Sequence, residues 1–479
     1  MPLAESTGLP PVGRAHMIGV AGAGMQALAA VLARQGWRLT GSDRTPDSAT
    51  SLARLGVKLS AGHDARNIDP DLRLVIHSDA VGPENVERRH AARLGLAEMS
   101  YPQAVAALMT QKRGLAVAGT HGKSTTTAMI GQTLTGAGFD PTVICGATPI
   151  APERAAHEIS VSRGAGPSGG EWFIAEACEY RANFLRFTPE IAVVLGIEPD
   201  HFDYYRSFDE LKSAFAQFIE GAFVRGGLVI ANADCPTTRR QINVARQSPS
   251  WRNAQCETFG FSSDAVWRPA RVRHIRGRYR FEIRRASKSI CEVSLRAPGR
   301  HLVTDALAAA AACHAAGATP EQIGHGLSQF AGLQRRLEHL DAAGPAIRLD
   351  DYAHHPTEIR ATLSAVRMMY PGKRISCIFQ PHQVSRTLAL LDEFAASLQN
   401  ADSVAVSEVF AARETVDDAR REDVARQLAH RVGSLGVATH ASCRLEEIFA
   451  HMVTAARPGD VIVTLGAGDI RKRCDELAD

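Results

Sequence analysis

A short glycine-rich segment, GTHGKSTTT at residues 119–127, has the residue types of a phosphate-binding loop. An apolar run precedes it and a segment with helical character follows it, which is the strand–loop–helix order that such a loop requires. Backbone N–H groups at the start of a helix point toward a bound anion. Lys123 can reach the terminal phosphates of a nucleotide, and the Ser124 hydroxyl can bind Mg²⁺. The longer Walker pattern would need glycine where the chain has Val117, so a glycine turn with a solvated lysine is the alternative interpretation.

A second glycine cluster, GVAGAG at residues 19–24, follows a predicted buried strand. Asp43 comes about 20 residues further on, where a carboxylate binds the ribose in dinucleotide folds. The spacing is G-x-x-G-x-G and differs from the strict dinucleotide fingerprint, so the cluster either binds a diphosphate or forms a structural turn. The candidates for binding a diphosphate-containing substrate are Gly22, Ala23, Gly24, Met25 and Asp43.

Acidic residues and a histidine follow two predicted strands in the middle of the chain. EACEY occupies residues 176–180, and EPDHFD occupies residues 198–203. Open α/β sheets build their sites at the carboxyl ends of strands, and a triphosphate site needs a divalent cation with oxygen or nitrogen ligands. Together, next to a phosphate loop, the acidic residues and the histidine of these two segments favour Mg²⁺ sites. Taken singly, each acidic residue fits a solvated loop charge better than a metal ligand.

The last third of the chain carries histidines and an arginine at predicted strand ends. DDYAHHPTE contains His354 and His355, and neighbours in sequence point in different directions. One of the two is therefore expected to be packed or to cap the following helix. FQPHQVSRT contains His382 and Arg386, and an arginine can hold a carboxylate through two parallel hydrogen bonds.

The elements that must position these residues alternate between strand and helix, which predicts parallel sheets with right-handed crossovers. The predicted strands cover residues 16–20, 38–43, 72–81, 114–119, 171–177, 189–197, 226–234, 347–353, 373–380, 403–410 and 460–468. Helices are predicted at 25–35, 125–138 and 304–317, a β-hairpin region at 267–296 and a loop at 159–170. The fold class is therefore α/β.

Composition excludes several classes of protein. The chain has 479 residues and a net charge of +3, and its acidic and basic residues are interspersed. It lacks the basic footprint of a nucleic-acid or anionic-membrane binder, and no apolar run approaches the roughly 18 residues of a membrane-spanning helix. The N-terminus has no signal-peptide core. Nine cysteines without C-x-x-C spacing argue against a disulfide framework or zinc ribbon and favour a reducing cytoplasm.

These motifs, in this order, resemble the Mur ligases of peptidoglycan synthesis. The resemblance rests on GVAGAGM, GTHGKSTTT, EACEYRANFL, EPDHFDYY, NAD at 232–234, GRHLVTDALAA, GLQRRLE, DDYAHHPTE, FQPHQVSRT and GAGDI. It implies an N-terminal Rossmann-like UDP-substrate domain at 1–112, a central P-loop ATPase-type domain with a mostly parallel sheet at 113–330, and a C-terminal Rossmann-like amino-acid domain at 331–479. The shortened phosphate loop is the family's usual form, so the resemblance favours a true nucleotide loop.

The resemblance also implies an activity, that of an ADP-forming ligase with ATP and Mg²⁺ as cofactors. It is closest to the members that join L-alanine to the lactyl carboxylate of UDP-N-acetylmuramate through an acyl phosphate, as cytoplasmic monomers or homodimers. The implied catalytic residues are Lys123, Glu179, His201, His354 and Arg386. The implied Mg²⁺ ligands are Ser124, Glu179 and His201. The implied nucleotide-binding residues are Gly119, Thr120, His121, Gly122, Lys123, Ser124, Thr125, His301, Asp305, Arg336 and Asp351, and His355 and His382 join the substrate-binding set.

The chain departs from the family's usual residues at several positions. Cys178 stands where the family commonly has aspartate, and Gly196 stands where it commonly has asparagine. Leu302 and Asp305 each occupy a position that is usually asparagine, and Gln383 occupies a position that is usually arginine. The Gln383 exchange leaves the amino-acid or peptide acceptor open, so a ligase that attaches a recycled peptide to UDP-N-acetylmuramate is one alternative. A non-catalytic muropeptide-binding protein with the same fold is a second. A nicotinamide oxidoreductase built on GVAGAG is a third, and it would leave the 119–125 loop unexplained.

Overall fold

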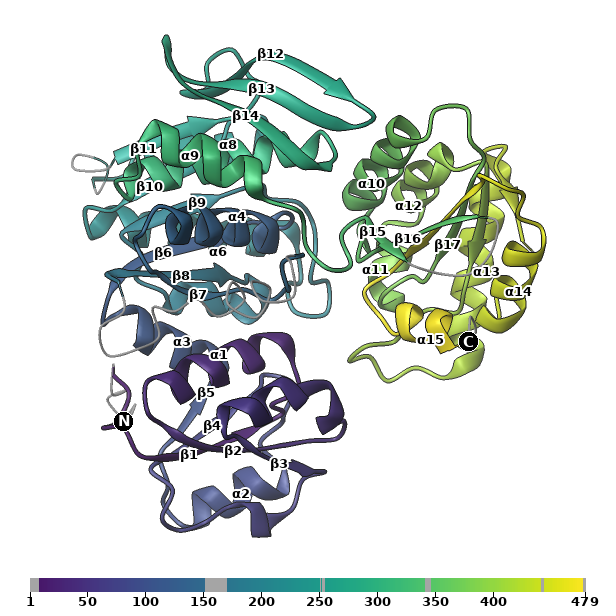
Figure 1. Cartoon of the computed structure of the whole chain (residues 1–479). Coiled ribbons are helices and arrows are strands. Elements are labelled where there is room, and N and C mark those ends of the chain that lie inside the picture. Colours follow the sequence, from purple (N-terminus) through teal and green to yellow (C-terminus); the bar gives the residue numbers. More distant parts are fainter. Residues whose placement is uncertain are drawn as a thin grey trace.

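The protein is a three-domain α/β structure in which helices cover three separate sheets (Figure 1). The computed structural model describes residues 8–150, 170–249, 251, 255–340, 346–440 and 443–476. The N-terminal sheet lies at the bottom of Figure 1, the central sheet lies above it, and the C-terminal sheet lies to the right. The loop predicted at 159–170 falls almost entirely outside the described residues.

The N-terminal sheet has five parallel strands in the order β3-β2-β1-β4-β5. The strands are β1 (Arg14–Ile18), β2 (Arg38–Asp43), β3 (Lys58–Ala61), β4 (Leu74–His77) and β5 (Glu98–Ser100). The helices are α1 (Ala23–Arg34), α2 (Val86–Arg93) and α3 (Tyr101–Met109), with 3-10 turns η1 (Pro46–Leu55) and η2 (Ala65–Asn67). The predicted strand at 38–43 is confirmed at both ends, and the predicted β1 and α1 each begin two residues earlier than expected.

The central sheet has nine strands in the order β14-β13-β12-β11-β10-β9-β6-β8-β7. The strands are β6 (Arg113–Ala118), β7 (Thr142–Ile144), β8 (Trp172–Ala177), β9 (Ile191–Val194), β10 (Leu228–Asn232), β11 (Gln255–Phe259), β12 (Trp267–Ile275), β13 (Arg278–Arg285) and β14 (Lys288–Pro298). The helical elements are α4 (Lys123–Gly136), η4 (Tyr180–Arg186), α6 (Phe208–Val224), α7 (Pro236–Ala245), α8 (His301–Ala315) and α9 (Pro320–Gln329). The predicted hairpin region is an antiparallel ribbon of three strands, β12 to β14.

The C-terminal sheet has six strands in the order β15-β16-β20-β17-β18-β19, and only β15 runs antiparallel to its neighbour. The strands are β15 (Glu338–Leu340), β16 (Ile347–Asp351), β17 (Ile375–Phe379), β18 (Ser403–Val406), β19 (Ala438–Thr439) and β20 (Val461–Leu465). The helices are α10 (Pro356–Met369), α11 (Val384–Ala389), α12 (Leu391–Ser397), α13 (Asp418–Ser434), α14 (Leu445–Thr454) and α15 (Ile470–Glu476), with the 3-10 turn η6 (Leu398–Asn400).

Strand order in the central sheet brings the candidate residues together. β6 lies between β9 and β8 and is parallel to both. The phosphate loop follows β6, Glu179 follows β8, and the 198–203 segment follows β9. Because parallel strands end at the same edge of a sheet, these three segments share one edge. β6, β8 and β9 are buried almost throughout, as expected for strands with helices on both faces.

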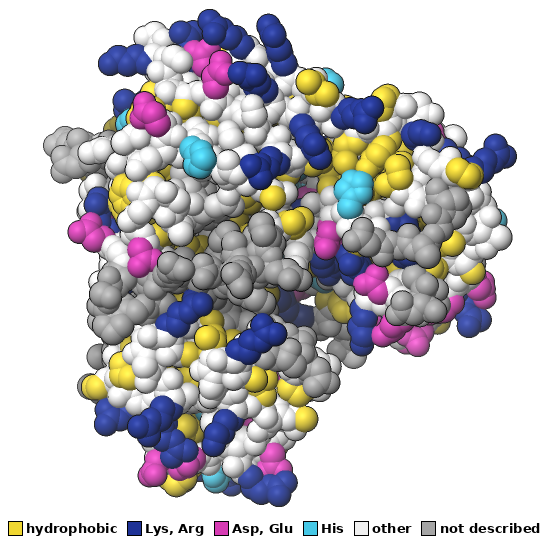
Figure 2. Space-filling view, viewed as in Figure 1, with side chains coloured by type: hydrophobic (Ala, Val, Ile, Leu, Met, Phe, Trp, Pro, Cys, Tyr) yellow, Lys and Arg dark blue, Asp and Glu magenta, His cyan; other side chains and the backbone are white. Residues whose placement is uncertain are grey.

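Basic side chains gather over the β12–β14 ribbon at the top of Figure 2. Acidic and basic residues are interspersed along the sequence, whereas the folded structure concentrates basic side chains on this ribbon. Part of it is neutralised within the ribbon, since Arg280 pairs with Glu292 at 2.7 Å and Arg271 with Glu282 at 3.5 Å. Among the described helices, none combines the length and the apolar character needed to span a bilayer.

Candidate functional site

The loop between β6 and α4 has the backbone shape of an anion-binding turn. Gly119 and Gly122 have φ angles of +136° and +80°, a region that favours glycine. A Cβ at Gly122 would lie 2.7 Å from Asp305 Oδ1, so the loop also needs glycine for space. No side chain caps the N-terminus of α4 at Gly122. The first N–H groups of α4 therefore face outward with the positive end of the helix dipole, which fits a phosphate.

The partly buried Lys123 and the buried Glu179 form an ion pair beside this loop. Lys123 Nζ lies 2.9 Å from Glu179 Oε2 and 3.1 Å from Oε1, and it also donates to the Gly119 carbonyl. Burial alone would raise the pKa of Glu179, but the Lys123 charge and His201 lower that pKa to about 2. Burial likewise lowers the pKa of Lys123, and the Glu179 charge outweighs it and holds that pKa above its ordinary value. Both groups are therefore charged at neutral pH.

The predicted metal ligands are brought only partly together. His201 Nε2 lies 3.5 Å from Glu179 Oε1, and the His201 backbone has a φ of +55°, a strained conformation often found at functional sites. Ser124 instead donates to Glu176 Oε2 at 3.1 Å. The donor set of carboxylate oxygen, hydroxyl and imidazole nitrogen fits a divalent cation.

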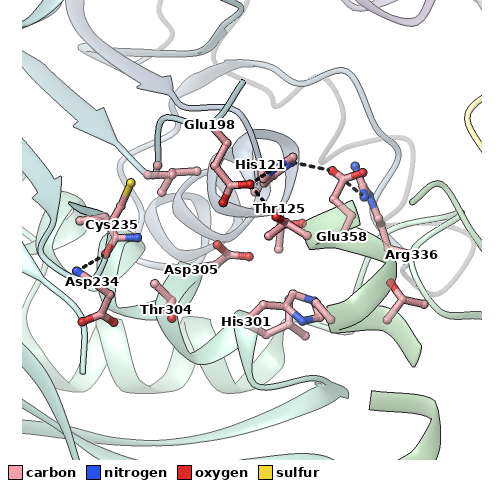
Figure 3. Close-up of a pocket in the computed structure, with 18 of the residues that line it drawn as sticks. His121, Thr125, Glu198, Asp234, Cys235, His301, Thr304, Asp305, Arg336 and Glu358 are labelled. Carbon is pink, nitrogen blue, oxygen red and sulfur yellow. Dashed lines mark hydrogen bonds and ion pairs between the residues drawn. The ribbon is translucent and has the colours of Figure 1, made fainter. Parts of the chain in front are cut away.

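A cavity of about 450 Å³ opens beside the loop, between the central and C-terminal domains (Figure 3). The predicted nucleotide-binding residues that line it are His121, Gly122, Thr125, His301, Asp305, Arg336 and Asp351. Its wall is largely apolar on one side, where Leu195, Phe330 and Leu333 contribute. A cavity of this size and character, next to a phosphate loop, suits a nucleoside.

Two carboxyl groups of the cavity are held partly neutral. Burial raises the pKa of Asp305 to about 7, although Arg336 opposes the shift. Burial also raises the pKa of Asp351 to about 6, and Asp351 accepts hydrogen bonds from the Leu337 and Ala353 backbones at 2.8 Å each. Asp305 therefore titrates near physiological pH while it faces the phosphate loop.

His121 of the phosphate loop contacts two carboxylates, one in its own central domain and one in the C-terminal domain. Its ring nitrogens lie 3.5 Å from Glu198 in the central domain and 3.3 Å from Glu358 on α10 (Figure 3). Withdrawal from water lowers the pKa of His121, but Glu198 and Glu358 raise it to about 9. Thr357 adds a hydrogen bond to Glu198 at 2.5 Å. The phosphate loop is therefore in direct contact with the C-terminal domain.

Arg386 makes a second contact between the domains. Its Nη2 lies 2.6 Å from Asp200 Oδ1 and its Nε donates to the same oxygen at 2.8 Å, with both side chains buried. Burial raises the pKa of Asp200, and Arg386 outweighs it and lowers that pKa strongly. Arg386 Nη1 faces His382 Nδ1 at 3.3 Å. The guanidinium that we predict to bind a substrate carboxylate is therefore already paired with a protein carboxylate.

The two adjacent histidines have different roles. His355 caps α10 by accepting a hydrogen bond from the Thr357 backbone at 3.3 Å, which confirms that one of the pair is a helix cap. His354 Nδ1 contacts the Tyr352 carbonyl at 3.0 Å, and its ring lies 5.6 Å from that of His382. Burial lowers the pKa of His354 to about 4, although Glu358 opposes the shift. His354 is therefore neutral near pH 7.

In the N-terminal domain, the GVAGAG loop connects β1 to α1 at the carboxyl edge of the sheet. α1 begins at Ala23, and no side chain caps Gly22. Gly24 packs against the Tyr101 side chain. A Cβ atom at residue 24 would lie 2.8 Å from the Tyr101 hydroxyl oxygen. Asp43 accepts a hydrogen bond from the Ala21 backbone at 2.9 Å, so its carboxylate supports the loop itself. Met25 is buried in the core of this domain.

Several residues that contact the candidate site are missing from the predicted set. Glu358 and Thr357 reach the phosphate loop or Glu198 from α10, and Asn232, the last residue of β10, lines the cavity. All three residues belong to the motifs DDYAHHPTE and NAD, and this membership is the feature of the sequence that could have pointed to them. Their contacts depend on how the central and C-terminal domains pack against each other, and residue spacing along the chain does not predict this packing.

Three family models match consecutive parts of the chain. They are described as the Mur ligase family catalytic domain at residues 14–113, the Mur ligase middle domain at 117–313, and the Mur ligase glutamate ligase domain at 335–468. The UDP-N-acetylmuramate–L-alanine ligase of Desulfitobacterium hafniense is 37% identical over 95% of this chain and 97% of its own.

Solved structures of related ligases resemble the chain over nearly its whole length. A UDP-N-acetylmuramate–alanine ligase from Thermotoga maritima matches with a TM-score of 0.77 and 26% identity, over 97% of this chain and 98% of the other. A murein peptide ligase from Psychrobacter arcticus shares the fold with a TM-score of 0.72 at 24% identity, over 97% and 98% of the two chains.

Proposed function

Because the chain belongs to the Mur ligase family, we propose that it is an ATP-dependent ligase that joins L-alanine to the lactyl carboxylate of UDP-N-acetylmuramate in peptidoglycan precursor synthesis. The observation that carries the proposal is a phosphate loop that holds the Lys123–Glu179 ion pair and whose His121 and Gly122 line a cavity between two domains. The printed names of the similar full-length relatives support the substrates.

The physical difficulty of the first step is that a carboxylate and a triphosphate repel each other. When bound, ATP supplies the phosphoryl group that activates the carboxylate, and Mg²⁺ offsets part of the charge. Lys123 supplies a fixed positive charge at the loop, held in place by the Gly119 carbonyl and Glu179. Glu179 and His201, with Ser124, are the residues that would hold the cation. His301, Asp305, Arg336 and Asp351 would surround the nucleoside.

The second step needs an oriented amine and the exclusion of water. We propose that the C-terminal domain supplies both, since an acyl phosphate in contact with water would hydrolyse. His354 is neutral and its ring lies 5.6 Å from that of His382, so we place these imidazoles beside the incoming amine. Arg386 would orient the amino-acid carboxylate as part of its buried pair with Asp200. We propose hinges near residues 112 and 330, where the family models also break.

Replacing His201 with alanine is expected to raise the Mg²⁺ concentration for half-maximal activity by about tenfold or more, as loss of one metal-orienting group does elsewhere. The reason is that His201 faces the Glu179 oxygen at 3.5 Å. A magnesium titration of ATP-dependent phosphate release measures the shift. His314→Ala, on α8, is the matched control, and an unchanged titration for His201→Ala would assign that histidine a purely structural role.

Nucleotide affinity is expected to fall as pH rises through about 7. The burial-raised pKa of Asp305, about 7, means that its carboxyl is neutral below that pH and negative above it, beside the phosphate loop. One additional negative charge at this distance lowers affinity by about tenfold. Calorimetric titration with ADP on both sides of the pKa measures the change. Asp305→Asn should bind ADP with a flatter pH dependence, and an equally steep profile in that variant would refute the assignment.

The function is tested by incubating the purified protein with ATP, Mg²⁺ and UDP-N-acetylmuramate, and with either L-alanine or a tripeptide. Mass spectrometry of the UDP-linked product identifies what was attached. We expect a product heavier by one alanyl residue, together with equimolar phosphate release. Attachment of the tripeptide alone would favour the peptide-recycling ligase, and binding of UDP-N-acetylmuramate without phosphate release would favour a non-catalytic binding protein.

A further inference from the structure

Cys178 differs from the other eight cysteines of the chain because its side chain is exposed. It is the first residue after β8, directly before Glu179, and so lies at the edge of the sheet that carries the phosphate loop. The family resemblance leads one to expect an aspartate here. The exchange replaces a hard oxygen donor with a sulfur donor at a position that faces other metal-binding groups.

The thiol is one of three different donors that converge on one point. A sulfur of Cys178, a carboxylate oxygen of Glu179 and a ring nitrogen of His201 all lie within 4.8 Å of one another. His201 Nε2 and Glu179 Oε1 are 3.5 Å apart. Glu179 is completely buried, whereas Cys178 is open to solvent, so an ion can reach the cluster from outside.

Three protein ligands of mixed sulfur, oxygen and nitrogen type, with one position open, are typical of an accessible zinc site. Thiolate ligands select soft or borderline cations, whereas Mg²⁺ prefers oxygen. We propose that Cys178, Glu179 and His201 form a binding site for a thiophilic divalent cation of the Zn²⁺ or Cd²⁺ class. On binding, the Cys178 thiol releases its proton to solvent and its sulfur forms the bond to the metal.

This site overlaps the groups that we propose for Mg²⁺. Glu179 Oε1, which lies 3.5 Å from His201 and accepts a hydrogen bond from Lys123 at 3.1 Å, would exchange that Lys123 contact for the thiophilic cation, while Oε2 keeps its 2.9 Å contact with Lys123. A bound Zn²⁺ therefore competes with Mg²⁺ for Glu179 and His201, and low concentrations should inhibit ATP turnover. Binding itself needs neither ATP nor UDP-N-acetylmuramate, so it can be tested even if the proposed reaction is wrong.

The experiment is a titration of the full-length, reduced protein with Cd²⁺ alone, followed by ultraviolet absorbance of the thiolate–cadmium bond. We expect one equivalent to bind with a charge-transfer band that Zn²⁺ displaces. Cys178→Asp should lose the band while remaining folded by circular dichroism. Cys291→Ser, which removes a half-buried thiol on β14, should keep it. His201→Ala should lower the cadmium affinity by about tenfold or more, because one of three ligands is lost.

Two results would overturn the proposal. One is a cadmium–thiolate band that persists in Cys178→Asp, which would place the bound thiol elsewhere in the chain. The other is an unchanged cadmium affinity in His201→Ala, which would mean that the thiol binds the ion without the cluster.

Discussion

Replacing Lys123 with alanine is expected to reduce ATP-dependent phosphate release by about 10²- to 10³-fold, the range for removing a group that stabilises charge in the transition state. The expectation rests on the position of the ammonium group, which is held at the phosphate loop by Gly119 and Glu179. Turnover is measured by steady-state phosphate release with saturating UDP-N-acetylmuramate and L-alanine. The same variant leaves Glu179 buried without the Lys123 ammonium group that neutralises it, so the unfolding free energy should fall by about 3 kcal/mol.

The two effects can be separated with further variants. Lys123→Met combined with Glu179→Gln removes both charges and should recover stability without recovering turnover. Lys288→Ala removes an exposed lysine on β14 and serves as the control for loss of positive charge. Turnover in Lys123→Ala comparable to that of the unmodified protein would mean that the loop does not position the phosphoryl group.

Replacing Arg386 with alanine is expected to raise KM for L-alanine by about 30-fold or more, corresponding to at least about 2 kcal/mol for truncation of a buried charge partner. The structural reason is that Arg386 binds Asp200 at 2.6 Å across the two domains and presents Nη1 beside His382. Without the guanidinium, Asp200 is buried and unpaired, and the C-terminal domain loses a contact that aligns it with the phosphate loop. Initial-rate kinetics at varied L-alanine concentration measure the effect.

A double-mutant cycle distinguishes this buried pair from a surface contact. Arg386→Met and Asp200→Asn should show a coupling energy of at least about 1 kcal/mol in KM or in stability. The control pair is Arg431 and Asp392, which are 2.6 Å apart but exposed, and their coupling should be close to zero. Additive effects at Arg386 and Asp200 would show that the observed pair does not align the domains.

The local parts of the site could be predicted from the sequence. Strand–loop–helix order around residues 119–127 and the position of Glu179 after a buried strand follow from hydrophobic pattern and glycine placement. Helix capping by one residue of the His354–His355 pair followed from their adjacency and from Pro356 at the first position of α10. In each case the information lies within a few residues of the feature that it predicts.

Contacts between domains could not be predicted in the same way. His121 and Glu358 meet at 3.3 Å although 237 positions separate them, and Asp200 and Arg386 are 186 positions apart. The sequence assigns His121 and Arg386 to a site but identifies neither of their partners, Glu358 and Asp200, because residue spacing does not show which domains meet. The strand predicted at 403–410 ends at Val406 in the structure. The prediction is too long because apolar Val409 and Phe410 continue the hydrophobic pattern into the loop.

The central claim is that the phosphate loop activates a carboxylate by transferring a phosphoryl group to it. The most direct measurement uses UDP-N-acetylmuramate with a heavy oxygen isotope in the lactyl carboxylate, and follows that isotope by mass spectrometry. The account predicts that one labelled oxygen per turnover appears in the released inorganic phosphate, because the attacking carboxylate oxygen leaves with it. Unlabelled phosphate, or label in AMP, would contradict it.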